Sequence, residues 1–223
     1  MTGDRTSARI AGICFLAAMV ASLAGASILE PLLAGPDAIR ALGQARPLAV
    51  AGIALEFVNA IAVILIAATL FPILKRRNEG AAMAYVGIRI AESLACVLAA
   101  FVPVLLLALG RNGQPGGPGE GLSLASSAAL LLALRAGSSG LLVPLFFCLD
   151  ALILYSLLYR SRILPRFIAV WGLAAVAAVA AANVAPAGLG LFPAFALPII
   201  ANEVFLGIWL IAKGFRAGSE LAT

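Results

Sequence analysis

The chain has 223 residues, of which 63% are hydrophobic and 11% are charged, and its formal net charge is +5. Soluble domains carry about a quarter charged residues and roughly half apolar ones, so this composition argues against a soluble protein. The basic residues stand in short clusters at the ends of apolar runs, where membrane topology accounts for them and nucleic-acid binding is not indicated. The chain contains no histidine, which excludes histidine-ligated haem, HExxH metalloproteases, Ser-His-Asp triads and histidine proton relays.

The three cysteines, Cys14, Cys96 and Cys148, lie inside apolar runs and form no CxxC pair. Their positions predict small buried side chains rather than a disulfide framework or a zinc site. We therefore expect no metal and no cofactor, and we interpret the chain as a single integral membrane domain, residues 1–223.

Six apolar runs are long enough to cross the ~30 Å hydrocarbon core of a bilayer as helices. They are residues 10–29, 48–74, 81–109, 140–159, 166–182 and 194–212. The first run has the basic start of a secretory signal peptide, but its length favours a retained helix. The sequence thus predicts an all-α fold, a polytopic membrane bundle of six transmembrane helices.

The region between the third and fourth runs differs from the rest. Residues 111–121 form a glycine- and proline-rich loop, which lacks the GK[ST] ending and the preceding strand of a phosphate-binding loop. The apolar run at residues 122–134 is too short to span a bilayer. We expect a short interfacial or re-entrant helix near residues 122–135, ended by Arg135.

The basic clusters predict the orientation of the chain. With six crossings, the N-terminus and residues 75–77, 160–166 and 213–216 fall on one side. Lysine and arginine accumulate on the cytoplasmic side of membrane proteins, so both termini are expected in the cytoplasm and the protein in the cell membrane.

Polar side chains stand inside four of the six apolar runs. They are Glu56, Asn59, Arg89, Glu92, Ser93, Asp150, Asn202 and Glu203. A rise of ~1.5 Å per residue places them at similar depths, and helical spacing puts Arg89, Glu92 and Ser93 on one face. Because a charged group in a bilayer is costly, we expect these side chains to face the interior of the bundle.

The charges in this set do not balance, because one arginine cannot neutralise four carboxylates in a medium of low dielectric constant. Either some carboxyl groups are protonated, or a bound cation or a water-filled cavity compensates the charge. The predicted binding residues are Glu56, Asn59, Arg89, Glu92, Asp150, Asn202 and Glu203. No catalytic and no metal-binding residue is predicted.

Three motifs together resemble a known family. They are Tyr85-x-x-x-Arg89-x-x-Glu92, the YRSRILPR run at residues 159–166 and the EVFLGIWLIAKG run at residues 203–214. In this order they resemble the bacterial membrane-protein family catalogued as domain of unknown function 4386, over nearly the whole chain. The resemblance implies a six-helix bacterial inner-membrane protein and no established activity. The family's arginine and glutamate in the third helix and glutamate in the sixth map onto Arg89, Glu92 and Glu203.

Three functions stay open at this point. In the first, the polar centre binds a cation, a proton or a polar small molecule, and the protein is a transporter or binding protein that contacts the lipid bilayer. Such a protein would act as a homodimer if one copy is too small for transport. Alternatively, the buried ion pairs only fix the packing of a structural or accessory subunit. An intramembrane lipid-modifying enzyme is the third, less favoured because the chain has no recognised nucleophile motif or metal-ligand spacing.

Overall fold

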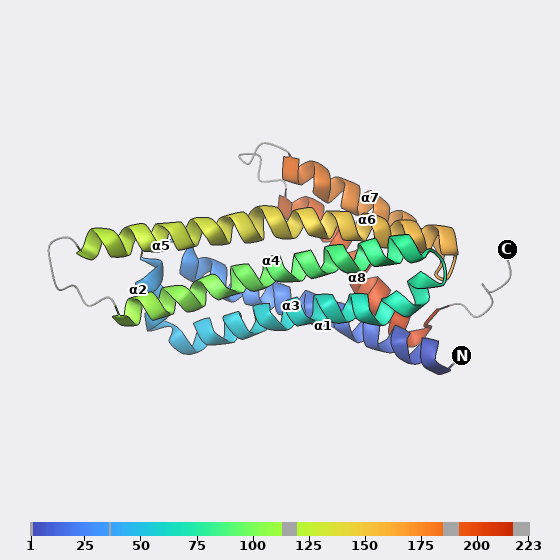
Figure 1. Cartoon of the computed structure of the whole chain (residues 1–223), viewed down its shortest axis with the longest axis horizontal. Coiled ribbons are helices and arrows are strands. Elements are labelled where there is room, and N and C mark those ends of the chain that lie inside the picture. The colour runs from blue at the N-terminus through green and yellow to red at the C-terminus, as the bar shows by residue number, and fades with distance from the viewer. Residues whose placement is uncertain (1, 36, 113–119, 185–191, 216–223) are drawn as a thin grey trace.

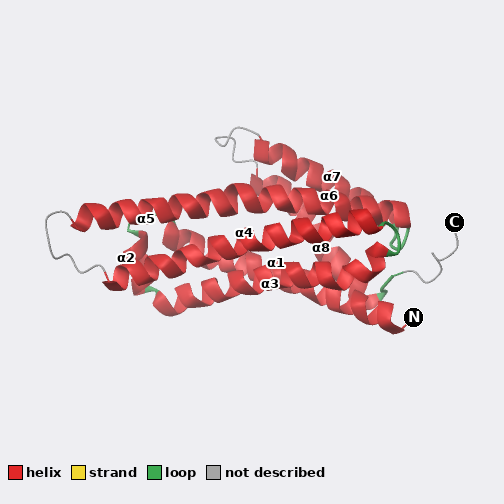
Figure 2. Ribbon diagram, viewed as in Figure 1, coloured by secondary structure: helices red, strands yellow, loops and turns green. Residues whose placement is uncertain are grey.

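The computed structural model describes residues 2–35, 37–112, 120–184 and 192–215, all of them helical or in short connections (Figure 1). Helices alone make up the regular structure of these residues (Figure 2), so the predicted all-α fold is confirmed. The elements are α1 (Thr2–Leu33), α2 (Ala38–Gln44), α3 (Arg46–Lys75), α4 (Glu79–Asn112), α5 (Glu120–Gly137), the π-helical turn η1 (Ser138–Leu142), α6 (Val143–Ser161), α7 (Arg166–Val184) and α8 (Phe192–Ala212).

Six helical segments are long and apolar enough to cross a membrane, as predicted. They are Asp4–Leu33, Arg46–Lys75, Glu79–Arg111, Leu124–Ser161, Arg166–Asn183 and Ala194–Ala212. Large apolar side chains such as Leu23, Leu94 and Ile208 are exposed on the outside of the bundle, where a bilayer would cover them. The protein is a multi-pass integral membrane protein.

The membrane helices form a closed ring. Going round it, α1 packs on α3, α3 on α4, α4 on α6, α6 on α7, α7 on α8, and α8 returns to α1. The short helix α2 packs mainly on α4 and α1, while α5 lies along α4. Each helix of the ring therefore turns one face toward a shared interior, which is where the polar side chains meet.

One end of the bundle is rich in basic residues, and we call it the basic end. At this end α1 begins and α8 ends (Figure 1). The Arg76 guanidinium donates to the Asp4 carboxylate at 2.9 Å, which ties the end of α3 to the start of α1. The described basic residues at this end are Arg5, Arg9, Lys75, Arg76, Arg77, Arg160, Arg162, Arg166 and Lys213.

Two glycines allow α1 and α8 to approach closely. A Cβ atom on Gly12 would lie 2.5 Å from the Gly207 carbonyl oxygen, and one on Gly207 would lie 3.1 Å from the Gly12 oxygen. Small residues permit such backbone contact between membrane helices. This contact closes the ring between the first and last helices.

The prediction of a separate short helix near residues 122–135 is wrong. Instead, α5 continues through η1 into α6, and Leu124–Ser161 is a single apolar span of 38 residues. Arg135 does not end the helix; it is 4% exposed. The hydroxyls of Ser138 and Ser139 donate to the carbonyl oxygens of Leu134 (2.6 Å) and Arg135 (2.9 Å), so they are satisfied inside the helix. The physical reason is that carboxylates on other helices, those of Glu30 and Glu56, accept hydrogen bonds from Arg135 and so allow it to lie inside the bundle.

Candidate functional site

Arg89 of α4 is the centre of a buried charge cluster. Its Nη1 donates to Glu92 Oε2 at 3.0 Å, and its Nε lies 3.3 Å from Asp150 Oδ2 of α6. The same Nε donates to the Tyr85 hydroxyl at 3.2 Å. Arg89, Glu92 and Asp150 are 3%, 4% and 0% exposed. One guanidinium thus serves two buried carboxylates from different helices, and we call this group the Arg89 cluster.

Several polar atoms in and around the Arg89 cluster have no hydrogen-bond partner among the described residues. They are Arg89 Nη2, both carboxylate oxygens of Asp150 and the Tyr155 hydroxyl. Buried polar atoms without partners are uncommon in protein interiors. This incomplete bonding distinguishes the cluster from the packed core around it.

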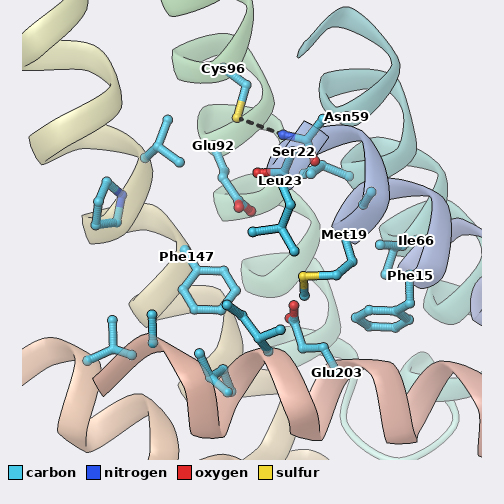
Figure 3. Close-up of a pocket in the computed structure, with 18 of the residues that line it drawn as sticks. Phe15, Met19, Ser22, Leu23, Asn59, Ile66, Glu92, Cys96, Phe147 and Glu203 are labelled. Carbon is cyan, nitrogen blue, oxygen red and sulfur yellow. Dashed lines mark hydrogen bonds between the residues drawn. The ribbon is translucent and has the colours of Figure 1, made fainter. Parts of the chain in front are cut away.

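A cavity of about 290 Å³ lies beside the Arg89 cluster, lined by residues from α1, α3, α4, η1, α6, α7 and α8. The carboxylates of Glu92 and Glu203 both point into this space, from α4 and α8 (Figure 3). Among the described residues, no hydrogen bond or ion pair reaches the carboxylate of Glu203. The cavity therefore has acidic groups on two sides.

The cavity reaches the surface of the bundle between α1 and η1. Ser22, Leu23 and Ser139 line it and are also exposed. The helices α7 and α8 have 19 and 21 residues, whereas α1 and α4 have 32 and 34. The shorter pair covers only part of the bundle's length (Figure 1), which leaves this opening beside the start of α8.

A second buried arginine, Arg135 of α5, forms a separate cluster that sequence reasoning missed. Its guanidinium donates to Glu56 Oε1 at 2.7 Å and Oε2 at 3.0 Å, and to Glu30 Oε1 at 2.9 Å. It also donates to the Ala99 carbonyl oxygen at 2.9 Å. We call this group, which joins α1, α3, α4 and α5, the Arg135 cluster. The signal in the sequence was that no proline and no acidic residue separates Arg135 from the apolar run that begins at residue 140.

Six of the seven predicted binding residues fall into three places. Arg89, Glu92, Glu203 and Asn59 line the cavity, and Asp150 lies behind it against Arg89. Glu56 belongs to the Arg135 cluster, so its predicted grouping with Arg89 is wrong.

Two neutral polar residues form hydrogen bonds that join neighbouring helices. Asn202, predicted as a binding residue, donates from Nδ2 to the Ile168 carbonyl oxygen at 3.1 Å and joins α8 to α7. The Ser93 hydroxyl donates to the Ala60 carbonyl oxygen at 2.8 Å and joins α4 to α3. Asn59 has a weaker contact, 3.8 Å from Nδ2 to the Cys96 sulfur, and it retains access to the cavity.

The chemistry of the site follows from its charges. Arg89 is already in contact with Glu92 and Asp150, while Glu203 adds a third carboxylate at the cavity wall. No group of three or more histidine, cysteine, aspartate or glutamate side chains within the described ranges is arranged to hold a metal ion. The arrangement is therefore suited to attract a positively charged ligand or a proton.

A family model described as "Domain of unknown function (DUF4386)" matches residues 10–214. The chain belongs to this family. The DUF4386 match begins within α1 and ends just after α8, so it includes part of every helix of the ring and both arginine clusters. It confirms the resemblance that the three sequence motifs indicated. No curated protein and no solved structure matches the chain.

Proposed function

We propose that this DUF4386 protein is a binding or transport protein of the cell membrane whose central cavity takes up a positively charged ligand. The observation that carries the proposal is the pair of carboxylates, Glu92 and Glu203, that point into one cavity (Figure 3). The cation nearest to them, Arg89, is shared with Asp150. An additional positive charge in the cavity would therefore be stabilised.

The charge balance supports this proposal. Arg89 supplies one positive charge, and Glu92, Asp150 and Glu203 supply up to three negative charges. A site of low dielectric constant does not retain such an excess, so protons or a cationic ligand must compensate it. The same groups would let a ligand and a proton compete for the site, which is how a proton-coupled exchanger works.

The position of the cavity along the bundle also supports the proposal. At ~1.5 Å per residue, Arg89 lies about 15 Å from the basic end of α4. Ser22 and Ser139, at the opening, lie about 30 Å from the basic end along their helices. The apolar part of α1 begins at Ile10, so Ser22 lies about 18 Å into a hydrocarbon core that is ~30 Å thick. With the basic end in the cytoplasm, the cavity would lie from mid-membrane into the outer half of the bilayer.

The test compares three purified variants: Glu203→Gln, Glu92→Gln and the control Glu79→Gln. Glu79 is exposed and pairs with Lys75 at the surface, 3.0 Å away. Thermal unfolding in detergent is followed with sodium, potassium, magnesium, ammonium and benzylammonium chlorides. At least one cation is expected to raise the Tm of the wild-type protein and of Glu79→Gln, and to lose this effect in Glu203→Gln. Equal responses in all variants, or no response to any cation, would refute the proposal.

The alternative of a purely structural role is supported by the Arg135 cluster. There the half-buried carboxylate of Glu56 receives two hydrogen bonds from one arginine. Such pairs fix the register of helices. The distinction between the two roles can therefore be tested within one molecule.

A further inference from the structure

We infer that the ligand of the cavity is a monovalent organic ammonium ion with an apolar body; this rests on the proposed function and identifies its substrate class. The first argument is size. The cavity of about 290 Å³ is at the lower end of the range of small-molecule sites, and it has several times the ~30 Å³ that one water occupies in the liquid. A bare metal ion would leave most of this space unfilled.

The second argument is the chemistry of the walls. Apolar side chains make up most of the lining, among them Phe15, Met19, Ile66, Phe147 and Ile199. Such walls cannot replace the hydration shell of an inorganic ion, which makes its transfer costly. An apolar ligand body, in contrast, gains free energy when it contacts them.

The third argument is the distribution of charge. Glu203 stands on α8 with no partner among the described residues, while the Glu92 carboxylate on α4 is already bonded to Arg89. One ammonium group paired with Glu203 would therefore meet the strongest uncompensated charge at the wall. The rings of Phe15 and Phe147 border the same space (Figure 3), and aromatic rings attract organic ammonium ions.

The arrangement is poorly suited to a hard metal ion. Magnesium and calcium require six or more oxygen ligands at short, defined distances. The polar groups at the wall come instead from separate helices, with Glu92 on α4, Asn59 on α3 and Glu203 on α8 (Figure 3). Within the described part of the chain, no three acidic, cysteine or histidine side chains form such a set.

The test uses benzylammonium as the probe and the full-length protein in detergent. Benzyl alcohol has nearly the same shape without the charge, and sodium, potassium and magnesium chlorides supply charge without the apolar body. Benzylammonium is expected to raise the Tm by about 2–4 °C at about five times its Kd, in a saturable manner. Benzyl alcohol and the inorganic salts at equal ionic strength are expected to have no saturable effect.

Two variants complete the test. Glu203→Gln is expected to weaken benzylammonium binding at least tenfold, whereas Glu79→Gln leaves it unchanged. Met19→Trp fills part of the cavity and retains both carboxylates, so it is expected to abolish benzylammonium binding even if Glu203→Gln cannot be purified. Unchanged binding of benzylammonium to Met19→Trp would overturn the inference.

The outcomes separate the inference from the proposed function. A saturable response to sodium, potassium or magnesium that depends on Glu203, without one to benzylammonium, overturns the organic ligand and leaves a cation-binding protein. An equal response to benzyl alcohol overturns the requirement for charge. No response to any cation, or the same response in Glu203→Gln, overturns the inference and the proposed function together.

Discussion

Arg89 and Arg135 are both buried arginines in membrane helices, at 3% and 4% exposure, yet their surroundings differ. Arg135 makes four hydrogen bonds, two of them to the carboxylate of Glu56. Its second carboxylate, on Glu30, is 62% exposed and remains solvated. Arg89 is instead shared by two buried carboxylates, and a cavity adjoins it.

The difference teaches that burial of a charge does not by itself indicate function. The Arg135 cluster is nearly neutral in its buried part and well bonded, which is what a contact between helices requires. The Arg89 cluster has more negative than positive groups, and Arg89 Nη2 and both Asp150 oxygens have no hydrogen-bond partner among the described residues, whereas in the Arg135 cluster only Arg135 Nε is in this state. Four substitutions test this contrast, and they are ordered here from the largest expected effect on stability to the smallest.

Arg135→Met is expected to have the largest effect. It leaves Glu56 half-buried without its counter-charge, and breaking such a pair costs about 3–5 kcal/mol of the free energy of unfolding. Thermal unfolding in detergent measures the loss, and Lys75→Met, which removes the exposed pair with Glu79, is the control at about 0–1 kcal/mol. The double variant Arg135→Met/Glu56→Leu should recover most of the loss. A double variant no more stable than Arg135→Met would show that the pair does not have this role.

Glu56→Gln is the next largest change. It removes the charge that accepts two hydrogen bonds from Arg135 while keeping the shape of the side chain. Arg135 then has only the exposed carboxylate of Glu30, so a loss of about 2–3 kcal/mol is expected. The same unfolding measurement checks it. An unchanged free energy of unfolding would mean that the carboxylate of Glu30 alone is enough to stabilise the buried Arg135.

Asp150→Asn makes the same chemical change in the Arg89 cluster, with a smaller expected effect. Arg89 keeps Glu92 as a partner, and the excess of negative charge is reduced. The free energy of unfolding is therefore expected to change by no more than about 1 kcal/mol in either direction. A loss as large as that of Glu56→Gln would contradict the contrast between the two clusters.

Glu203→Gln is expected to have the smallest effect on stability. No ion pair or hydrogen bond to its carboxylate exists among the described residues, so the free energy of unfolding should change by less than about 0.5 kcal/mol. Binding of benzylammonium, measured by the shift in Tm, should nevertheless be lost. A variant that is strongly destabilised would instead assign Glu203 a packing role.

The six membrane spans could be predicted because their length and apolar character are local properties of the sequence. The Arg89–Glu92 contact was equally accessible, since it joins positions three apart on one helix. Depth along the helices correctly grouped Asp150 with Arg89. These parts of the site required no knowledge of which helices are neighbours.

The Arg135 cluster could not be predicted in this way. Its main contact joins residues 79 positions apart, and nothing local marks Glu56 as its partner. Depth gives the level of a side chain in the membrane but not the direction in which it points, so Glu56 was grouped with Arg89. The cost of an unpaired arginine in lipid then made Arg135 look like a helix end.

The π-helical turn Ser138–Leu142 separates the two clusters along one continuous helix. A turn of this kind closes with bonds from i to i+5 and holds one residue more than a regular turn. The faces of α5 and α6 are therefore offset by about 100° compared with an uninterrupted helix. Loss of a single codon in this turn would restore the regular helix and swing Arg135 away from Glu56, while Asp150 stayed beside Arg89. During evolution, a change of one residue in length can thus detach Arg135 from Glu56 while the pairing of Arg89 with Asp150 is kept.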